Sequence, residues 1–261
     1  MADRSVPLAE VVAWCDAQLR TAEIPDYPPA LNGLQLANRG RVHRIGAAVD
    51  GSQRAIDAAI GGGCDFLVLH HGLFWGGNQR IVGMHYERLQ RLLRADVAVY
   101  GSHLPLDAHP TYGNNARLAR TLGLEPTAGF GKFQTIHVGV QGSADVDTAA
   151  LLGRVQAFSA SFGGSVVHTP IDAGRRTTRW AIITGAGASS ESLRDAAAQG
   201  IDTLITGEGP HHTAVEAPEL GIVVMYAGHY ATETLGVSAL AEALSAEFGL
   251  PWAFIATPTG T

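Results

Sequence analysis

Residues 45–71 read IGAAVDGSQRAIDAAIGGGCDFLVLHH, and their pattern indicates the fold class. Its two apolar runs, Ile45–Val49 and Phe66–Leu69, have the length and composition of buried strands. Between them, Ser52 is a typical helix N-cap residue, and a helical stretch is expected up to about Ile60. The stretch is therefore predicted to form a strand, a helix and a second strand, as in a parallel sheet covered by helices.

The same alternation continues on both sides of this stretch. The pattern predicts helices over 7–19, 86–94, 114–122, 148–159, 189–198 and 232–248. Further strands are expected over 97–100, 136–140, 165–168, 181–184, 203–206 and 222–226. We therefore expect an α/β protein with mainly parallel sheets.

The second half of the sequence resembles the first, which predicts two similar α/β lobes. Gly200–Ile205 matches Gly63–Val68 position by position, and Val223–Tyr226 matches Val97–Tyr100 in the same way. The glycine-rich segment 128–132 is the candidate linker, so the expected lobes are 1–127 and 133–261, with the C-terminal segment free to pack back on the first lobe. The alternative is that two α/β segments look alike by chance.

Composition excludes several classes of protein. The chain has 261 residues, 46% apolar and 16% charged, which excludes a disordered chain, and its net charge of -6 argues against nucleic acid as the main partner. It contains no apolar run long enough to span a membrane and no signal-peptide pattern at its start. Two cysteines, Cys15 and Cys64, cannot build a disulfide framework. We expect a cytoplasmic protein.

Histidines and carboxylates gather just after the predicted strands. Ligands bind beyond the carboxyl ends of parallel strands, so these side chains are expected in one crevice at that edge. Neutral imidazole suits zinc, iron, nickel and copper, a mixed set of imidazole and carboxylate accepts zinc, iron, manganese or nickel, and a carboxylate can bridge two such ions. The sequence predicts a dinuclear metal site with two divalent ions per chain, and the candidate ligands are His70, His71, His103, Asp107, His229 and Glu233.

This prediction depends on the local structure around Glu233, and two alternatives stay open. If a helix starts near Thr232, Glu233 lies in its first turn and His229 just before it. A histidine after a strand is also commonly a hydrogen-bonded loop residue, and Trp75 is either a packed aromatic or a wall of the pocket.

Glu208, His211 and His212 follow another predicted strand and are candidate catalytic residues. They are expected to relay protons, to contact substrate or to orient a metal ligand rather than to bind the metal directly. Four other histidines do not follow a predicted strand in this way and are expected to be surface or core residues; they are His43, His85, His137 and His168. His109 lies nearer to the candidate ligands, but Pro110 after it predicts a turn.

Several motifs resemble the YbgI-like (NIF-three-like) family of dinuclear metal-centre proteins. They are His70–Trp75, Asn32–Gln35, Leu106–Pro110 with Gly113–Asn115, Thr206–Glu208 and Gly228–Glu233, and they cover nearly the whole chain in order. The resemblance implies that the six candidate ligands hold two metal ions between two α/β lobes and that the molecule is a toroidal homohexamer.

The resemblance also implies a function, because the family is commonly named for similarity to GTP cyclohydrolase I type 2. The first hypothesis is a metal-dependent hydrolase acting on a small nucleotide-like molecule. The alternatives are a metal-handling protein that stores, inserts or senses divalent metal, and a regulatory interaction scaffold without catalysis.

Overall fold

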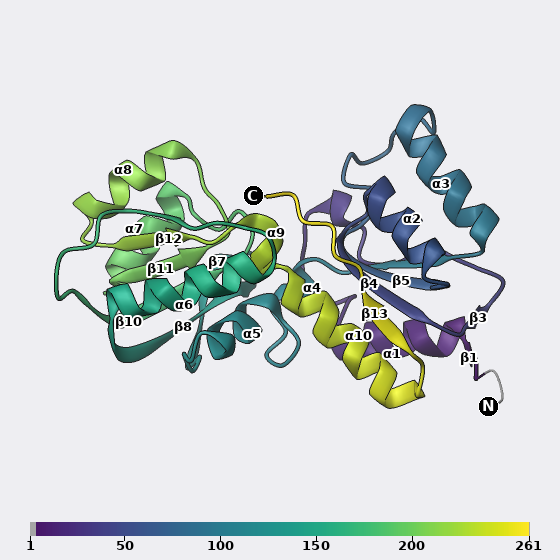
Figure 1. Cartoon of the computed structure of the whole chain (residues 1–261), viewed down its shortest axis with the longest axis horizontal. Helices are drawn as coiled ribbons and strands as arrows, with labels where there is room; N and C mark the ends of the chain where they lie inside the picture. The colour runs from purple at the N-terminus through teal and green to yellow at the C-terminus, as the bar shows by residue number, and fades with distance from the viewer. Residues whose placement is uncertain (1–3, 261) are drawn as a thin grey trace. The chain divides into compact units, whose positions relative to one another are not determined.

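The computed structural model describes residues 4–260 and divides the chain into two compact units. Unit 1 contains the chain up to Leu106 and returns for Gly236–Thr257, and unit 2 contains Asp107–Leu235 and the last residues from Pro258. The α/β fold class is confirmed (Figure 1). Within residues 4–260, no helix combines the length and the apolar character needed to cross a membrane.

Unit 1 is built on a five-stranded sheet in the order β13-β4-β5-β6-β2. These strands are β13 (Trp252–Phe254), β4 (Ile45–Asp50), β5 (Phe66–His71), β6 (Ala98–Gly101) and β2 (Gly33–Leu36). All neighbours are parallel except β2, which pairs antiparallel with β6. The short strands β1 (Val6–Pro7) and β3 (Arg41–Val42) form a separate antiparallel pair.

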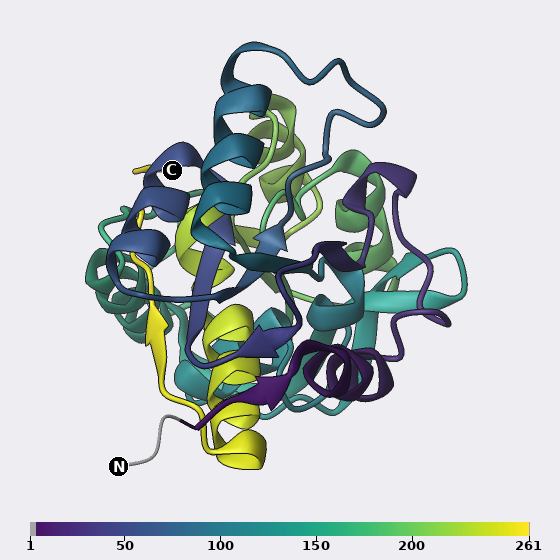
Figure 2. The same ribbon diagram turned by 90° about the vertical axis from the view of Figure 1, so that its right-hand side faces the viewer.

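Helices cover both faces of this sheet. Figure 2 shows α2 (Gln53–Gly61) and α3 (Gly83–Ala95) on one side, and α1 (Leu8–Leu19) and α10 (Thr234–Phe248) on the other. Leu67 and Leu69 of β5 pack with Ile56 of α2 and Leu92 of α3 in one fully buried cluster. The predicted strand–helix–strand order over residues 45–71 is thus confirmed, because these apolar residues gain burial in this arrangement.

Unit 2 is built on a six-stranded sheet in the order β7-β8-β10-β11-β12-β9. The strands are β7 (Ala128–Phe133), β8 (Ile136–Asp147), β10 (Arg176–Ile183), β11 (Thr203–Thr206), β12 (Val223–Tyr226) and β9 (Val167–His168). Only β10, β11 and β12 are mutually parallel. The sheet of this unit is therefore mixed, and the expectation of a mainly parallel sheet holds for unit 1 alone.

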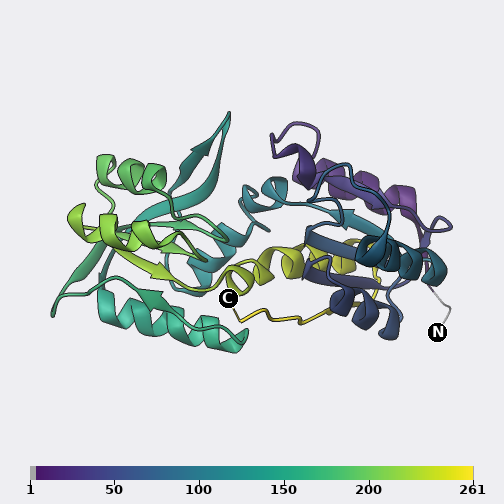
Figure 3. The ribbon, with the colours of Figure 1, turned by 90° about the horizontal axis from the view of Figure 1, so that it is seen from above.

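The helices of unit 2 lie on both faces of its sheet, as Figure 3 shows for α7 and α8 on one side and α6 on the other. Its helices are α5 (Asn114–Thr121), α6 (Thr148–Ser161), α7 (Ser190–Ala198), α8 (His211–Glu219) and α9 (His229–Thr232). Alternate residues of β10 point to opposite faces: Ile182 packs with α6 residues, and Ala181 packs with α7 residues.

Residues 128–132, the expected linker, form most of β7, which pairs antiparallel with β8. Their glycines serve close packing here, since a Cβ on Gly129 would lie 2.7 Å from the His137 side chain and Gly131 has φ +66°. The chain passes between the units at Leu106–Asp107, within the short helix α4 (Leu104–Asp107), and not in this segment.

Candidate metal centre

Three histidines gather at the carboxyl ends of the parallel strands in unit 1. His70 and His71 end β5, and His103 follows β6 by two residues. The ring centroid of His70 lies 4.9 Å from that of His71 and 5.0 Å from that of His103. One ring nitrogen from each residue lies within 4.8 Å of the others. We refer to these three residues as the histidine cluster.

Every ring of the histidine cluster is oriented through its Nδ1 atom. His70 Nδ1 lies 3.0 Å from the Ser102 carbonyl oxygen, and His71 Nδ1 lies 2.9 Å from Asp50 Oδ1. His103 Nδ1 lies 2.9 Å from Asp26 Oδ1. Carbonyl and carboxylate oxygens only accept hydrogen bonds, so each Nδ1 carries the proton. In a neutral ring the lone pair is then on Nε2, which is the arrangement found in histidines that bind metals.

Asp26 is the anchor of His103 and was not among the residues that the sequence singled out. Its side chain is only 6% exposed, and it also accepts hydrogen bonds from the backbone of Leu104 and from Asn32 Nδ2, each at 2.8 Å. Burial by itself raises the pKa of this carboxyl, but the hydrogen bonds from His103, Asn32 and Leu104 outweigh it and lower the pKa below its usual value. Asp26 therefore stays ionised and holds the His103 ring in place.

The Asn32–Gln35 motif holds the backbone next to the histidine cluster through side-chain hydrogen bonds. Asn32 Oδ1 accepts a hydrogen bond of 2.8 Å from the backbone of His103, and Gln35 Oε1 accepts one of 2.8 Å from that of Leu73. A Cβ on Gly72 would lie 2.2 Å from Gln35 Nε2, so a larger residue after His71 would displace the Gln35 amide that binds Leu73. The motif thus holds the backbone just after β5 and just after β6, where the three histidines lie.

Trp75 packs edge-on against two rings of the histidine cluster. Its ring centroid lies 5.7 Å from that of His71 and 4.8 Å from that of His103, and both pairs are T-shaped. Trp75 also lines a cavity next to His71. The two interpretations of this residue, packed aromatic and pocket wall, therefore both apply.

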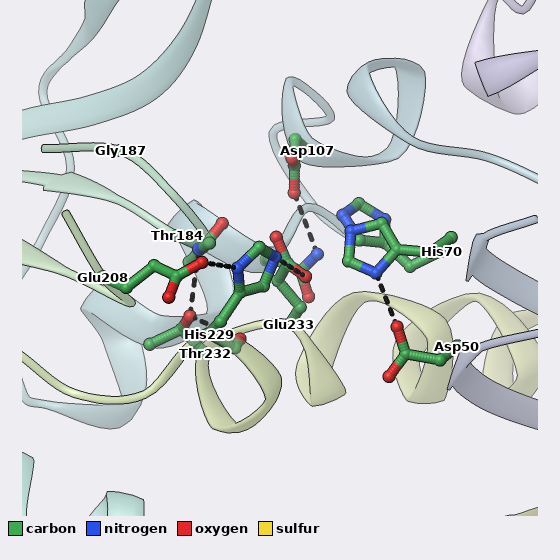
Figure 4. A network of polar contacts seen from close by, with 12 residues as sticks. Asp50, His70, Asp107, Thr184, Gly187, Glu208, His229, Thr232 and Glu233 are labelled. Carbon is green, nitrogen blue, oxygen red and sulfur yellow. Dashed lines mark hydrogen bonds and ion pairs between the residues drawn. The ribbon is translucent and has the colours of Figure 1, made fainter. Parts of the chain in front are cut away.

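Unit 2 has a second cluster, formed by Glu208, His229 and Glu233, which we call the His229 cluster. His229 Nδ1 lies 2.7 Å from Glu208 Oε1, and Nε2 lies 3.1 Å from Glu233 Oε2 (Figure 4). Glu208 follows β11, and His229 follows β12. Glu208 thus orients the imidazole, one of the roles expected for it, from a position where its side chain is 52% exposed.

The local structure around Glu233 differs from the expectation. Gly228, at φ 93°, precedes α9, which His229 opens, and Glu233 is the C-cap of that helix. The next helix, α10, starts at Thr234, so Glu233 does not lie in its first turn. Glu233 separates the two helices at φ -108°, and its buried carboxylate lies against the His229 ring four residues earlier.

The two carboxylates change the protonation of His229. Burial alone lowers the pKa of the imidazole, but the hydrogen bonds and charges of Glu233 and Glu208 raise it to about 9. In the metal-free protein the ring is therefore protonated at neutral pH. A cation bound to Nε2 has to replace that proton.

Two glycines make room for the His229 cluster. Gly185 has φ +63°, and a Cβ on it would lie 2.1 Å from Glu233 Oε1. A Cβ on Gly207 would lie 2.8 Å from the Cα of His229. Gly185 follows the strand β10, and Gly207 follows β11. The backbone at these two positions therefore packs directly against Glu233 and His229.

Asp107 is a buried carboxylate of unit 2 and is held by the Asn114–Asn115 motif. Asp107 Oδ1 accepts a hydrogen bond of 2.9 Å from Asn114 Nδ2, as Figure 4 shows in part. Asn115 Nδ2 donates to the backbone oxygen of Asp107 at 3.3 Å. Residues close to the expected ligand, which the sequence marked only as a motif, therefore fix its orientation.

His211 and His212 open α8, and both side chains are exposed. Within residues 4–260, neither side chain forms a hydrogen bond or ion pair. The structure does not bring them into the contacts that join Glu208, His229 and Glu233. His43, outside the register, pairs with Asp65 at 2.6 Å.

The chemistry of these donors fits divalent transition metals. Unit 1 offers three imidazoles whose Nδ1 atoms are already hydrogen-bonded, and unit 2 offers an imidazole with buried carboxylates. Such second partners set the tautomer and increase the basicity of the ligating nitrogen. The buried His, Asp and Glu groups can therefore hold a metal ion.

Comparisons with known proteins agree with the motifs. A protein of Deinococcus radiodurans named GTP cyclohydrolase 1 type 2 homolog is 41% identical over 259 residues, covering 96% of this chain and 93% of the relative. A Halobacterium salinarum protein of the same name is 40% identical over 256 residues, covering 97% and 99%.

Solved structures give the same answer. The protein ybgI, of unknown function, superposes with a TM-score of 0.87 at 34% identity, covering 98% of this chain and 100% of that one. TTHA1606 from Thermus thermophilus superposes with a TM-score of 0.83 at 35% identity and the same coverage. The sequence profile of the Duf34/NIF3 (NGG1p interacting factor 3) family matches residues 8–259. The resemblance to YbgI-like proteins is confirmed, and the chain belongs to the Duf34/NIF3 family.

Proposed function

We propose that this protein holds two divalent metal ions and is a metal-dependent hydrolase acting on a nucleotide-like substrate. The proposed ligands are His70, His71, His103, Asp107, His229 and Glu233. The observation that carries the proposal is the common orientation of the four histidines. Each of them has its Nδ1 hydrogen-bonded to a carbonyl or carboxylate oxygen. His43 and His168, outside the two clusters, also bond through Nδ1, so the orientation supports a metal site because it coincides with clustering. One ring nitrogen from each of His70, His71 and His103 lies within 4.8 Å of the others.

The course of the chain supports a shared set of ligands. The chain leaves unit 1 after Leu106 and returns to it at Gly236. His103 and Asp107 stand on either side of the first crossing, and Glu233 stands just before the second. One proposed ligand from each cluster thus stands within a few residues of a crossing between the units, while the third crossing, before Pro258, has no proposed ligand beside it.

Divalent ions bound by these residues would supply Lewis acidity and lower the pKa of a water molecule toward neutrality. The protein's own contribution is to move protons. Glu208 binds His229 through Oε1, while Oε2 has no hydrogen bond within the described residues 4–260. We assign Glu208 both the orientation of His229 and the transfer of a proton through Oε2. His211 and His212, exposed in the same unit, are proposed to contact substrate or to pass protons to solvent.

The substrate class rests on the relatives, whose name is GTP cyclohydrolase 1 type 2 homolog. A cyclohydrolase opens a ring with water, which is a reaction suited to an activated water and a proton carrier. We further propose a cytoplasmic homohexamer, as the resemblance implies, which light scattering after size exclusion would check.

The metal site is tested by elemental analysis of the purified protein and its variants. His103→Ala and His229→Ala are expected to lose bound zinc, iron, manganese or nickel. His43→Ala, which removes a histidine outside both clusters, is the matched control and is expected to keep the wild-type metal content. Equal metal content in all four proteins would refute the proposed ligands.

Hydrolysis is tested with the metal-loaded protein on GTP and simple phosphoesters. The wild type and Glu208→Gln are compared at saturating metal, because this substitution also changes the partner of His229. Glu208→Gln is expected to lose turnover under these conditions, and equal rates for both proteins would refute the proton-transfer role. If the bound ions pass readily to an acceptor and no substrate is turned over, the result favours a metal-handling protein over a hydrolase.

A further inference from the structure

Unit 1 contains a cavity of about 380 Å³ next to the histidine cluster. His71 forms part of its wall, together with Asp50, Ser52, Trp75, His85 and Arg88. Asp50 and His71 end the strands β4 and β5, Ser52 and Trp75 lie in the loops after these strands, and His85 and Arg88 belong to the helix α3. We call this cavity the Arg88 pocket. A molecule that fills it lies directly beside a proposed metal ligand.

Arg88 has no partner for its charge within residues 4–260. Its side chain is half-buried, its Nε is buried without a hydrogen-bond acceptor, and no carboxylate forms an ion pair with it. Arg91, one turn further along α3, instead pairs with Asp57 at 2.9 Å. A half-buried guanidinium without an acceptor is costly, which points to an acceptor that the chain itself does not supply.

A second donor lies on the same wall. Trp75 Nε1 is also buried without a hydrogen-bond acceptor among the described residues. The indole N–H can only donate, and so can all five N–H groups of Arg88. Two donor-only groups without acceptors on one cavity select a ligand rich in acceptor oxygens.

The rest of the wall agrees with an anion. Asp50 is the one carboxylate among the described lining residues, and its Oδ1 already accepts a hydrogen bond from His71 Nδ1. Ser52 caps α2 by accepting a hydrogen bond of 3.2 Å from the backbone of Ala55, so its hydroxyl proton remains for a ligand. Ser52 is the N-cap of the nine-residue helix α2, so the N-terminus of this helix lies beside the pocket. The positive end of the helix dipole attracts an anion.

The glycine-rich loop after β10 in unit 2 is a poorer phosphate site. Its backbone N–H groups are already used: that of Gly185 donates to Thr232 Oγ1, that of Gly187 to Thr206 Oγ1 and that of Ala188 to the Glu208 carbonyl oxygen. A loop that cradles phosphate needs these donors to point at the ligand.

We propose that the Arg88 pocket binds a phosphate group of the substrate, with Arg88 as the principal donor and Trp75 Nε1 and the Ser52 hydroxyl as further donors. The inference deepens the proposed function and rests on it for the statement that the occupant is a substrate. It assigns to Arg88 the discrimination between a nucleotide and a nucleoside. Arg88 is therefore a specificity-determining residue, and His71 places the pocket beside the metal centre.

The test measures the binding of GMP, guanosine and inorganic phosphate by calorimetry, with protein freed of metal by a chelator and with protein reloaded with Zn²⁺. Arg88→Ala removes the donor, and Arg88→Lys keeps the charge without the planar fork. Arg91→Ala is the matched control, because it removes the same charge from the same helix but leaves the pocket intact. Circular dichroism checks that each variant is folded.

The wild type is expected to bind GMP about tenfold or more tightly than guanosine in both metal states, as a charge-assisted hydrogen bond requires. Arg88→Ala is expected to abolish this difference, Arg88→Lys to keep part of it and Arg91→Ala to keep all of it. All variants are expected to retain the wild-type metal content.

Three results would overturn the inference: equal preference for GMP in wild type and Arg88→Ala, the same loss in Arg91→Ala, or no preference for GMP in the wild type. The two proposals fail separately. If phosphate binding depends on Arg88 but no hydrolysis is found, the hydrolase proposal is refuted and the anion site is supported. Hydrolysis with an unchanged KM for GTP in Arg88→Ala removes the anion site and keeps the hydrolase.

Discussion

Replacing Asp26 by asparagine is expected to destabilise unit 1 and to weaken metal binding at His103. The buried Asp26 carboxylate accepts four hydrogen bonds, from the backbone of Tyr27 and Leu104, from Asn32 Nδ2 and from His103 Nδ1. The amide of asparagine has only one acceptor oxygen, so its NH₂ group must face two of these donors.

The magnitude follows from the two hydrogen bonds that are lost. Each hydrogen bond to a buried charged group contributes about 1.5 to 3 kcal/mol, so Asp26→Asn should lower the free energy of unfolding by about 3 to 6 kcal/mol. The affinity for metal should fall by about 10- to 100-fold, as is usual when the partner of a ligating histidine is lost.

The assay is urea unfolding of the metal-free protein at neutral pH, followed by circular dichroism, with a separate metal titration. Asp57→Asn is the control, because Asp57 is 45% exposed and pairs with Arg91 on the surface, so its loss should cost less than about 1 kcal/mol. A change for Asp26→Asn as small as that for Asp57→Asn would refute the role given to Asp26.

The pH dependence gives an independent check of the same reasoning. The pKa of Asp26 is lower in the folded protein than its ordinary value of 3.8, so the carboxylate stabilises the fold above that value. This contribution is lost as the pH falls through the lowered pKa. The difference in stability between wild type and Asp26→Asn should therefore shrink in strong acid, and a difference that grows there would contradict the assignment.

Three further outcomes are expected in unit 2. In the metal-free protein, Glu208→Gln should lower the pKa of His229 from about 9, because it removes one of the two charges that favour the protonated ring; histidine NMR titration would show this, and an unchanged titration would refute the contact. The stability that protonated His229 provides is fully present below its ordinary pKa of 6.5 and is lost as the pH rises through about 9. Gly185→Ala should lower both the thermal stability and the metal content, since its Cβ would lie 2.1 Å from Glu233 Oε1 at a positive φ, whereas Gly61→Ala, with open space around the Cβ, should change neither. Wild-type behaviour of Gly185→Ala would contradict the packing described at this position.

The strands and the positions of the candidate ligands could be predicted because both leave local marks in the sequence. A parallel strand buried on both faces is a continuous apolar run, as at Phe66–Leu69, and a polar residue directly after it stands at the end of the sheet. The antiparallel strand β7 escaped prediction because its two glycines, Gly129 and Gly131, interrupt the apolar pattern. Its identity depends on pairing with β8 and not on its own composition.

Periodicity and motifs within a few residues are enough to establish the α/β class, the family and the residue types that stand after each parallel strand. The hydrogen bond that orients each candidate ligand ring through Nδ1 emerges only in the folded molecule. Asp26 reaches His103 across 77 positions of sequence, and Asp50 reaches His71 across 21. No local pattern encodes such contacts, since they form only when strands and loops distant in the chain are brought side by side.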